Sequence, residues 1–184
     1  MRVAQAEYVI GKNPDGGRES YTIVEKINGK NLYDLEWVDA AAKEEIDQSF
    51  SGYLGYVQGI LKQGGEFWYD LNLRQMVYGT RNDETQPHLY VVDLDPISHS
   101  WMTDEERSKN HSAAFNDTFS VITELLSQVS YIKEIEHKLI QSGKLGKTRT
   151  ALNNIINALR PIILDFNDRD LNRLTQELDA EVAQ

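Results

Sequence analysis

The feature that most constrains the fold is a change in the spacing of apolar residues at Asp39. From there they recur every three or four positions, which gathers them on one face of a helix. Asp39 is a suitable amino-terminal cap and Gly64-Gly65 a suitable stop. We therefore expect one long helix with an apolar face made of Ala42, Ile46, Phe50, Tyr53, Leu54, Val57, Ile60 and Leu61. Three glycines within it are expected to allow close packing rather than to break it: Gly52, Gly55 and Gly59.

The carboxy-terminal half repeats the helical spacing. A helix is predicted from about residue 113 to 141, and Gly143 follows its end. A second helix surrounds residues 152–159, with Pro161 at its end or at a bend. A third begins at Asn167 or Asp168. The apolar residues of the three helices are Phe115, Phe119, Ile122, Leu126, Val129, Ile132 and Leu139, then Leu152, Ile155, Ile156 and Leu159, then Leu171, Leu174, Leu178 and Val182.

Strand signals occupy the remaining segments. Residues 7–12 and 20–27 are rich in β-branched and aromatic residues, and the turn sequence NPDGG between them predicts a hairpin. Two further short strands are expected at 76–78 and 89–92. The fold class is α+β and mainly helical: an amino-terminal hairpin, a long central helix, two short strands and a helical carboxy-terminal half. We expect one domain in three segments, 1–36, 37–96 and 97–184.

Composition excludes several classes of function. The net charge of −10 argues against a nucleic-acid partner, which favours a basic face, and against an anionic membrane surface. The chain has no cysteine, which removes disulfides, thiolate metal sites and cysteine nucleophiles. No apolar run is long enough to span a bilayer, and the first residues lack the apolar core of a signal peptide. A cytoplasmic protein is the expectation.

Several catalytic patterns are incomplete. The sequence GKLGKT at 143–148 ends like a phosphate-binding loop, but Gln141 stands where the first glycine belongs and a helix precedes it, so a helix–helix turn is favoured. The four histidines have no spacing that would place two on one helix face for zinc. The nucleophile-elbow pattern GxSxG is absent from the sequence.

The sequence LYVVDLDP at 89–96 carries the most informative polar residues. Asp93 and Asp95 end a short strand at alternate positions, and alternate residues of a strand point to the same side. Two carboxylates so placed suit a hard cation such as Mg²⁺. In the alternative reading, one aspartate caps the turn at Pro96 and the other faces solvent.

The order of these segments resembles the carboxy-terminal lobe of the protein-kinase-like fold, including its aminoglycoside and choline kinase-like branches. YDLNLRQMVYG resembles the catalytic loop and the strand after it, and LYVVDLDP resembles the strand that ends in the metal-binding aspartate. YTIVEKINGKNLYDL resembles the fifth strand and hinge, and the helix from Asp39 resembles the long central helix. The resemblance spans roughly residues 7–96.

The resemblance implies a role for each matching residue. Asp70 takes the place of the catalytic base, and Asp93 that of the metal ligand, with Asp95 beside it. Gln75 stands where the family has an asparagine that holds a second metal. Glu25 and Ile27 fall in the segment that contacts the nucleotide. The implied cofactors are Mg²⁺ and ATP.

Departures from the family pattern leave three functions open. Gln75 replaces the asparagine, Trp68 stands in place of the catalytic-loop histidine, and no glycine-rich loop or strand lysine precedes the hairpin. The favoured interpretation is a binding or scaffolding module that binds a nucleotide and Mg²⁺ at most. The alternatives are an atypical ATP-dependent phosphotransferase, acting on a small molecule or a protein, and a helical interaction protein without an active site. A homo-oligomer formed through the hairpin is expected under either kinase-like reading.

Overall fold

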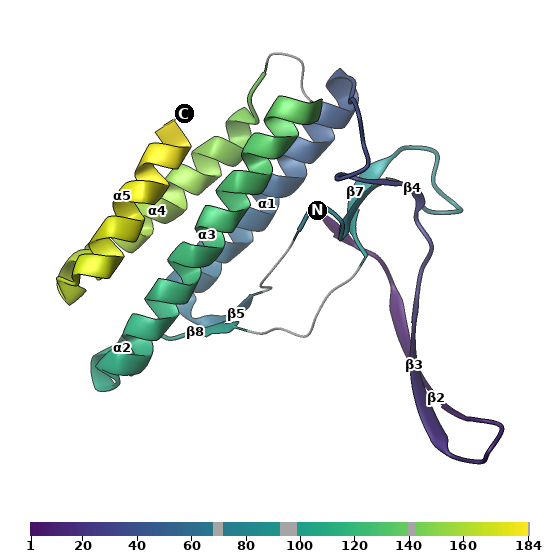
Figure 1. Cartoon of the computed structure of the whole chain (residues 1–184), viewed down its shortest axis with the longest axis horizontal. Helices are drawn as coiled ribbons and strands as arrows, with labels where there is room; N and C mark the ends of the chain where they lie inside the picture. Colours follow the sequence, from purple (N-terminus) through teal and green to yellow (C-terminus); the bar gives the residue numbers. More distant parts are fainter. Residues whose placement is uncertain (68–71, 93–98, 140–142, 184) are drawn as a thin grey trace.

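The computed structural model describes residues 1–67, 72–92, 99–139 and 143–183. It is an α+β protein in which helices dominate, as the sequence predicts (Figure 1). Its elements are, in order, β1 (Arg2–Val3), β2 (Ala6–Lys12), β3 (Arg18–Val24), β4 (Asn28–Asn31), α1 (Ala40–Gln63), β5 (Gly65–Phe67), β6 (Met76–Thr80), β7 (His88–Val91), β8 (His99–Trp101), α2 (Asp104–Lys109), α3 (His111–Leu139), α4 (Gly146–Phe166) and α5 (Arg169–Ala183).

Helix α1 confirms the change of period at Asp39. The Asp39 carboxylate accepts a hydrogen bond from the backbone N–H of Ala42 (2.8 Å), which caps the helix. At the other end Gly64 adopts a φ of 74° and donates its N–H to the carbonyl of Ile60 (2.8 Å). The predicted apolar face is buried except for Ile60, which is half-buried.

The glycines of α1 do not have the predicted packing role. A methyl group added at Gly52, Gly55 or Gly59 would meet no other atom within 4 Å. They therefore lie where no neighbour approaches, because α1 turns its other face to the bundle, and the prediction of close packing was wrong.

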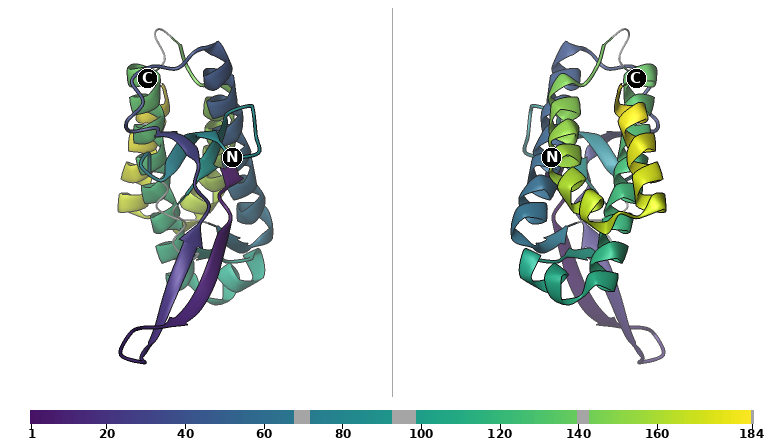
Figure 2. Two further views of the ribbon diagram at one scale, coloured as in Figure 1. Left: turned by 90° about the vertical axis from the view of Figure 1, so that its right-hand side faces the viewer. Right: turned by 90° about the vertical axis from the view of Figure 1, so that its left-hand side faces the viewer.

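Helices α1, α3, α4 and α5 form a bundle of roughly parallel and antiparallel helices, in which α1 packs against α4 and α3 packs against α5 (Figures 1 and 2). One continuous apolar core runs from Leu32 to Val182 and includes residues of all four. Pro161 lies inside α4, which continues to Phe166. Of the two predicted possibilities, that the helix ends at Pro161 was wrong. The short helix α2 was not predicted, because none of its residues is buried and it has no apolar face.

Asp47 of α1 fixes the start of α4. Its buried carboxylate accepts hydrogen bonds from the backbone N–H groups of Lys147 (3.1 Å) and Thr148 (2.8 Å), and from the Thr148 hydroxyl (2.7 Å). Leu145, the residue at the cap position of α4, supplies no side-chain hydrogen bond. A carboxylate from a neighbouring helix thus caps α4, and its negative charge interacts favourably with the positive amino-terminal end of the helix dipole.

A four-stranded sheet of order β1-β7-β6-β4 lies against α1 (Figure 1). Strands β6 and β7 confirm the two short strands predicted near 76–78 and 89–92, and they pair antiparallel with Met76 opposite Val91. Strand β4 pairs with β6, and Gly29 lies opposite Gly79. A methyl group at Gly29 would lie 2.1 Å from the Tyr78 carbonyl oxygen, so this crossing requires glycine.

Strands β5 and β8 form a separate antiparallel pair, with Phe67 opposite His99. Buried Trp101 at the end of β8 donates its indole N–H to the Leu61 carbonyl of α1 (3.1 Å). This small pair therefore joins the end of α1 to the chain that leads into α2.

Strands β2 and β3 form the predicted hairpin, which we call the arm and define as residues 6–24. The arm is a two-stranded sheet of its own and extends away from the helices and from the four-stranded sheet (Figures 1 and 2). Its base is closed by the Glu25 N–H, which donates to the Gln5 carbonyl (2.8 Å).

Candidate functional site

Within the described residues, the candidate site begins with the turn Asn72–Gln75, which precedes β6. The Gln75 N–H donates to the Asn72 carbonyl (3.1 Å), and the Asn72 N–H donates to the Gln75 side-chain oxygen (3.1 Å). The Arg74 N–H donates to the Asn72 side-chain oxygen (3.0 Å). Local side-chain bonds of this kind are typical of asparagine-rich turns and fix the backbone before β6 begins.

Gln75 lies directly beside the end of β7. The Val92 N–H donates to the Gln75 carbonyl (2.9 Å), and this bond continues the pairing of Met76 with Val91 by one residue. Val92 is the residue immediately before Asp93 in the sequence. The described chain thus brings the predicted second metal position next to the residue that precedes the predicted first one.

The two strand pairs bracket both predicted carboxylate segments. The chain leaves the β5–β8 pair at Phe67 and enters the β6–β7 pair at Met76, and it leaves the second pair at Val91 and returns to the first at His99. Asp70, Asp93 and Asp95 themselves lie outside the described residues. Among the residues that the structure does describe, no group of three or more His, Asp or Glu side chains is arranged to hold a metal ion.

The side chain of Gln75 is already engaged, since its oxygen accepts the Asn72 N–H. The same is true of Glu25, whose carboxylate accepts the Gln5 N–H (3.2 Å) and forms an ion pair with Arg81 (3.1 Å). Half-buried Ile27 immediately precedes β4. Gln75 directly precedes β6 and Arg81 directly follows it, so the two are separated by about 20 Å along the strand. Glu25, paired with Arg81, therefore lies at the other end of β6 from Gln75.

Arg74 is a residue that sequence reasoning missed. It belongs to the turn that carries Gln75, and its guanidinium lies 4.6 Å from the ring centroid of Tyr33. The ammonium of Lys138 approaches the same ring at 5.0 Å and donates to the Tyr33 carbonyl. Two cations thus meet at one aromatic ring beside the candidate site. The available signal was a basic residue four positions after Asp70.

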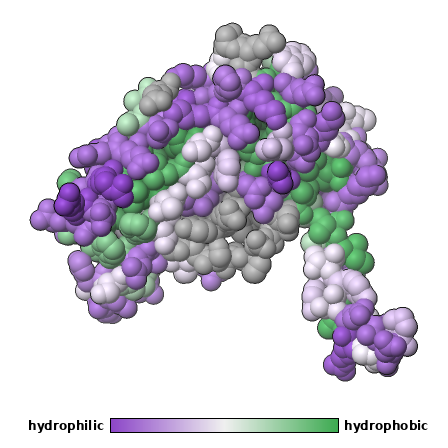
Figure 3. All heavy atoms as spheres, in the orientation of Figure 1, coloured by the Kyte–Doolittle hydropathy of each residue, from purple (hydrophilic) through white to green (hydrophobic). Residues whose placement is uncertain are grey.

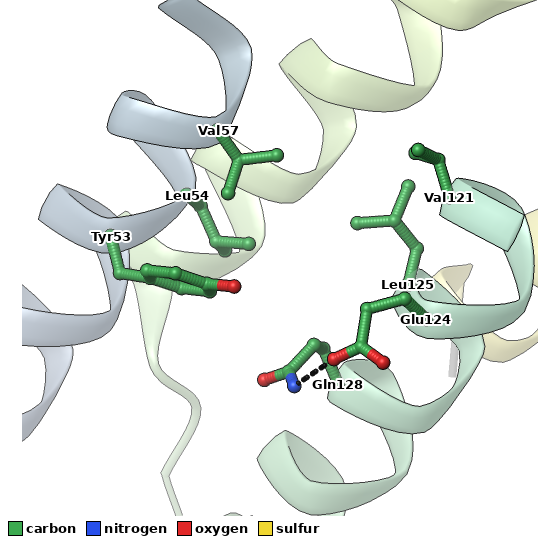
Figure 4. Close-up of a pocket in the computed structure, with 7 residues that line it drawn as sticks. All are labelled: Tyr53, Leu54, Val57, Val121, Glu124, Leu125 and Gln128. Atoms are coloured by element: carbon green, nitrogen blue, oxygen red, sulfur yellow. Dashed lines mark hydrogen bonds between the residues drawn. The ribbon is translucent and has the colours of Figure 1, made fainter. Parts of the chain in front are cut away.

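A small, mostly apolar cavity lies between α1 and α3 (Figure 4). Gln128 donates its amide N–H to the Glu124 carboxylate (2.7 Å), and the Tyr53 hydroxyl points toward them. Burial raises the pKa of Tyr53, and the nearby Glu124 charge raises it further. The cavity has a volume of about 10 Å³, which is near the size of one water and far too small for a cofactor. It is lined by Tyr53, Leu54, Val57, Val121, Glu124, Leu125 and Gln128.

The start of α4 is not an open phosphate-binding loop. The Lys147 and Thr148 N–H groups, which a phosphate would use, donate to Asp47, and the Lys147 ammonium pairs with Glu44. The sequence GKLGKT is thus accounted for by helix packing, in agreement with the interpretation as a helix–helix connection.

A wider groove lies where α2 and the start of α3 meet the end of α4. Its volume is about 290 Å³, and the ring of His111 packs edge-on against Phe166 at 4.8 Å. The groove brings one arginine and one histidine together with two carboxylates. Its lining residues are Asp104, Arg107, Ser108, His111, Ala114, Ile162, Asp165 and Phe166.

Comparison of the chain with protein-family models, with curated proteins and with solved structures gives no match. Within the described residues, every helix is too short or too polar to cross a lipid bilayer. The candidate site therefore rests on its own geometry and on the order of its segments.

Proposed function

We propose that this chain is a kinase-like module that binds a nucleotide together with Mg²⁺, and that it serves for binding or scaffolding rather than for phosphate transfer. Asp93 is the principal metal ligand in this proposal, Asp95 follows it by two positions, and Asp70 belongs to segment 68–71. The observation that carries the proposal is the hydrogen bond from Val92 to Gln75, which joins the two predicted metal-binding segments.

The strand pairs give a second support. The chain between Phe67 and Met76 and the chain between Val91 and His99 each connect the β5–β8 pair to the β6–β7 pair, so both begin and end at the same two strand pairs. A chain spans at most about 3.5 Å per residue, which limits how far either segment can depart from the other. Carboxylates from two such segments are a suitable source of oxygen ligands for Mg²⁺, which also takes ligands from nucleotide phosphates.

Arg74 would act on the phosphates rather than on the metal. It follows Asp70 by four positions, and its guanidinium is held against the Tyr33 ring. A guanidinium can contact phosphate oxygens through two parallel hydrogen bonds. In a chain of net charge −10, a local cation beside the site offsets the repulsion of a polyanionic ligand.

Binding is favoured over transfer because the groups needed for transfer are changed or engaged. Phosphoryl transfer depends on positioning and on electrostatic stabilisation of the phosphates. Gln75 replaces the expected asparagine and spends its side-chain oxygen on the Asn72 N–H. The engaged side chain of Gln75 suits a binding module.

A thermal-shift measurement with ATP and Mg²⁺ tests the proposal. We expect the melting temperature to rise in the unaltered chain and in Asp83→Ala, which removes an equal charge from an exposed loop. The rise should vanish in Asp93→Ala while that variant, without ligand, melts cooperatively. An unaltered chain that shows no rise in millimolar ATP and Mg²⁺ would contradict nucleotide binding.

The same samples separate binding from transfer. We expect the chain to release no phosphate from ATP and to label no added protein or small hydroxyl compound. Transfer that is lost in Asp70→Asn but retained in Asp83→Asn would instead identify an atypical phosphotransferase. A chain that neither binds nor transfers would leave the helical interaction protein as the remaining reading.

A further inference from the structure

The arm exposes several large apolar side chains to solvent. Its exposed large side chains include Tyr8 (66%), Ile10 (65%), Tyr21 (51%) and Ile23 (57%). In Figure 3 apolar residues run along the arm between the body and a hydrophilic tip. A two-stranded sheet is marginally stable in water by itself, and open strand edges pair readily with other strands.

The register divides the arm into two faces. Directly opposite residues of an antiparallel pair share a face, and their numbers in the arm add to 30, as in Val9 opposite Tyr21. Tyr8, Ile10 and the other even-numbered residues therefore occupy one face, and the odd-numbered residues occupy the other. Because both faces carry exposed apolar side chains, folding either face onto the body would leave the second one uncovered.

The backbone hydrogen bonds of the arm show which residues of β2 direct their N–H and C=O groups toward the open edge. At the tip the Asn13 N–H donates to the Gly17 carbonyl (2.9 Å), and at the base the Glu25 N–H donates to the Gln5 carbonyl (2.8 Å). Hydrogen-bonded pairs alternate with non-bonded pairs along an antiparallel ladder. The odd-numbered residues thus turn their backbone groups toward the partner strand. The open edge of β2 presents the backbone groups of Ala6, Tyr8, Ile10 and Lys12.

We propose that β2 pairs antiparallel with β2 of a second copy of this chain, around a two-fold axis at Val9. This register sets Tyr8 opposite Ile10 of the second copy and Ala6 opposite Lys12. All four residues present outward backbone groups, so each pair can exchange two hydrogen bonds. The two arms then form one four-stranded sheet of order β3-β2-β2-β3, an example of strand addition between identical edges.

The side chains fit this register on both faces. On the even face, Tyr8 and Ile10 of each copy meet at the centre as two aromatic–aliphatic cross-strand pairs. On the odd face, the two Val9 side chains meet on the axis, and a Tyr21 flanks each of them. Glu7 lies opposite Gly11 of the second copy, so no two like charges are directly opposed across the new pairing.

A second copy fits better than a charged partner. The arm contains only two basic and three acidic residues, so almost all of the net charge of −10 lies elsewhere in the chain. Two arms can therefore meet without strong local repulsion, whereas polyanions such as nucleic acid or an anionic membrane are disfavoured. The β3 edge is less suitable, because its outward positions are Arg18, Ser20, Thr22 and Val24.

Single-cysteine variants test the register, since the chain has no cysteine of its own. A non-hydrogen-bonded pair brings its Cα atoms to about 4.5 Å, which permits a disulfide. With copper–phenanthroline as oxidant, Val9→Cys should form a covalent dimer rapidly and Tyr21→Cys should not. Random collision would favour the opposite order, because Tyr21 is more exposed than half-buried Val9. Faster linkage of Tyr21→Cys would overturn the proposed register.

Sedimentation velocity tests the edge with a matched pair of proline variants. Ile10 and Ser20 lie opposite each other, and both N–H groups point away from the arm's own ladder, so proline at either spares the hairpin bonds. We expect dimers for the unaltered chain and Ser20→Pro, and about a tenfold or greater loss of affinity for Ile10→Pro. The proposal would be overturned if the unaltered chain stays monomeric over a concentration series that rises in 100-fold steps to about millimolar. A dimer whose affinity does not change in Ile10→Pro would also overturn it.

Discussion

Gly29 shows how a single atom can decide where two strands meet. It lies opposite Gly79, and an added methyl group at Gly29 would lie 2.1 Å from the Tyr78 carbonyl oxygen and 2.7 Å from the Gly79 Cα atom. Both obstacles are backbone atoms of β6, so they cannot yield by changing a side-chain rotamer. This pair attaches the segment after Glu25 to the hairpin that carries Gln75 and Val92.

We therefore expect Gly29→Ala to lower the free energy of unfolding by about 1–3 kcal/mol, as overpacking does. Gly52→Ala is the matched control, because nothing approaches that position and alanine favours the helix by about 0.5–1 kcal/mol. Urea denaturation of both variants measures the difference. Equal stability of the two variants would contradict the close approach of β4 and β6.

At the level of elements, the sequence predicted what depends on local spacing. Helix α1 has its predicted cap at Asp39 and its predicted buried face, and α3, α4 and α5 were each expected near their observed positions. The same holds for the arm, whose turn residues are local signals. Periodicity could not reveal that Phe119 is 39% exposed while neighbouring Thr118 is buried, because apolar spacing does not define the edge of the buried face of α3.

Elements that depend on long-range pairing were missed. Strands β5 and β8 have three residues each and pair across more than 30 positions of sequence, so neither has a local pattern to detect. Strand β4 has the sequence NGKN, which contains no β-favouring residue and exists through its pairing with β6. The candidate site is a prediction from residue types and their order, whereas the contact of Gln75 with Val92 is visible only in the fold.

The contact between α3 and α4 depends on a buried ion pair. Burial by itself would raise the pKa of Glu136, but hydrogen bonds from the Arg149 guanidinium (2.5 Å to Nη2) and from the Leu145 N–H (2.7 Å) outweigh it and hold that pKa below its usual value. The stabilisation is therefore present above the usual glutamate pKa and is lost as pH falls through the lowered value in the folded protein.

Glu136→Gln should accordingly be less stable than the unaltered chain at pH 7, by about 1–3 kcal/mol, since it leaves Arg149 buried without a counter-charge. The difference should narrow as pH falls below the usual glutamate pKa of 4.5. Urea denaturation from pH 3 to pH 7 measures it, with exposed Glu105→Gln as the control. A difference that stays constant with pH would show that the charge of Glu136 is not the source of the stability.

Considered as a whole molecule, the chain consists of a body with one continuous core and an arm that shares none of it. The Gln5 carbonyl and the Glu25 N–H are hydrogen-bonded, so the ends of the arm are already adjacent. Replacing residues 6–24 by a short glycine turn should therefore leave cooperative unfolding and the melting temperature of the body nearly unchanged. Differential scanning calorimetry checks this, and loss of the cooperative transition would show that the arm is part of the folding unit.

In the proposed function, the segments carrying Asp70 and Asp93 form one metal–nucleotide site next to Gln75. Mn²⁺ in place of Mg²⁺ tests it directly, because a paramagnetic ion broadens nearby amide signals in nuclear magnetic resonance spectra. With ATP present, we predict that Mn²⁺ broadens the signals of Asn72–Met76 together with those of Val91 and Val92, and that Asp93→Ala abolishes this while Asp83→Ala does not. Broadening that is absent from both segments, or that is spread over the acidic helix surfaces and persists in Asp93→Ala, would contradict the site.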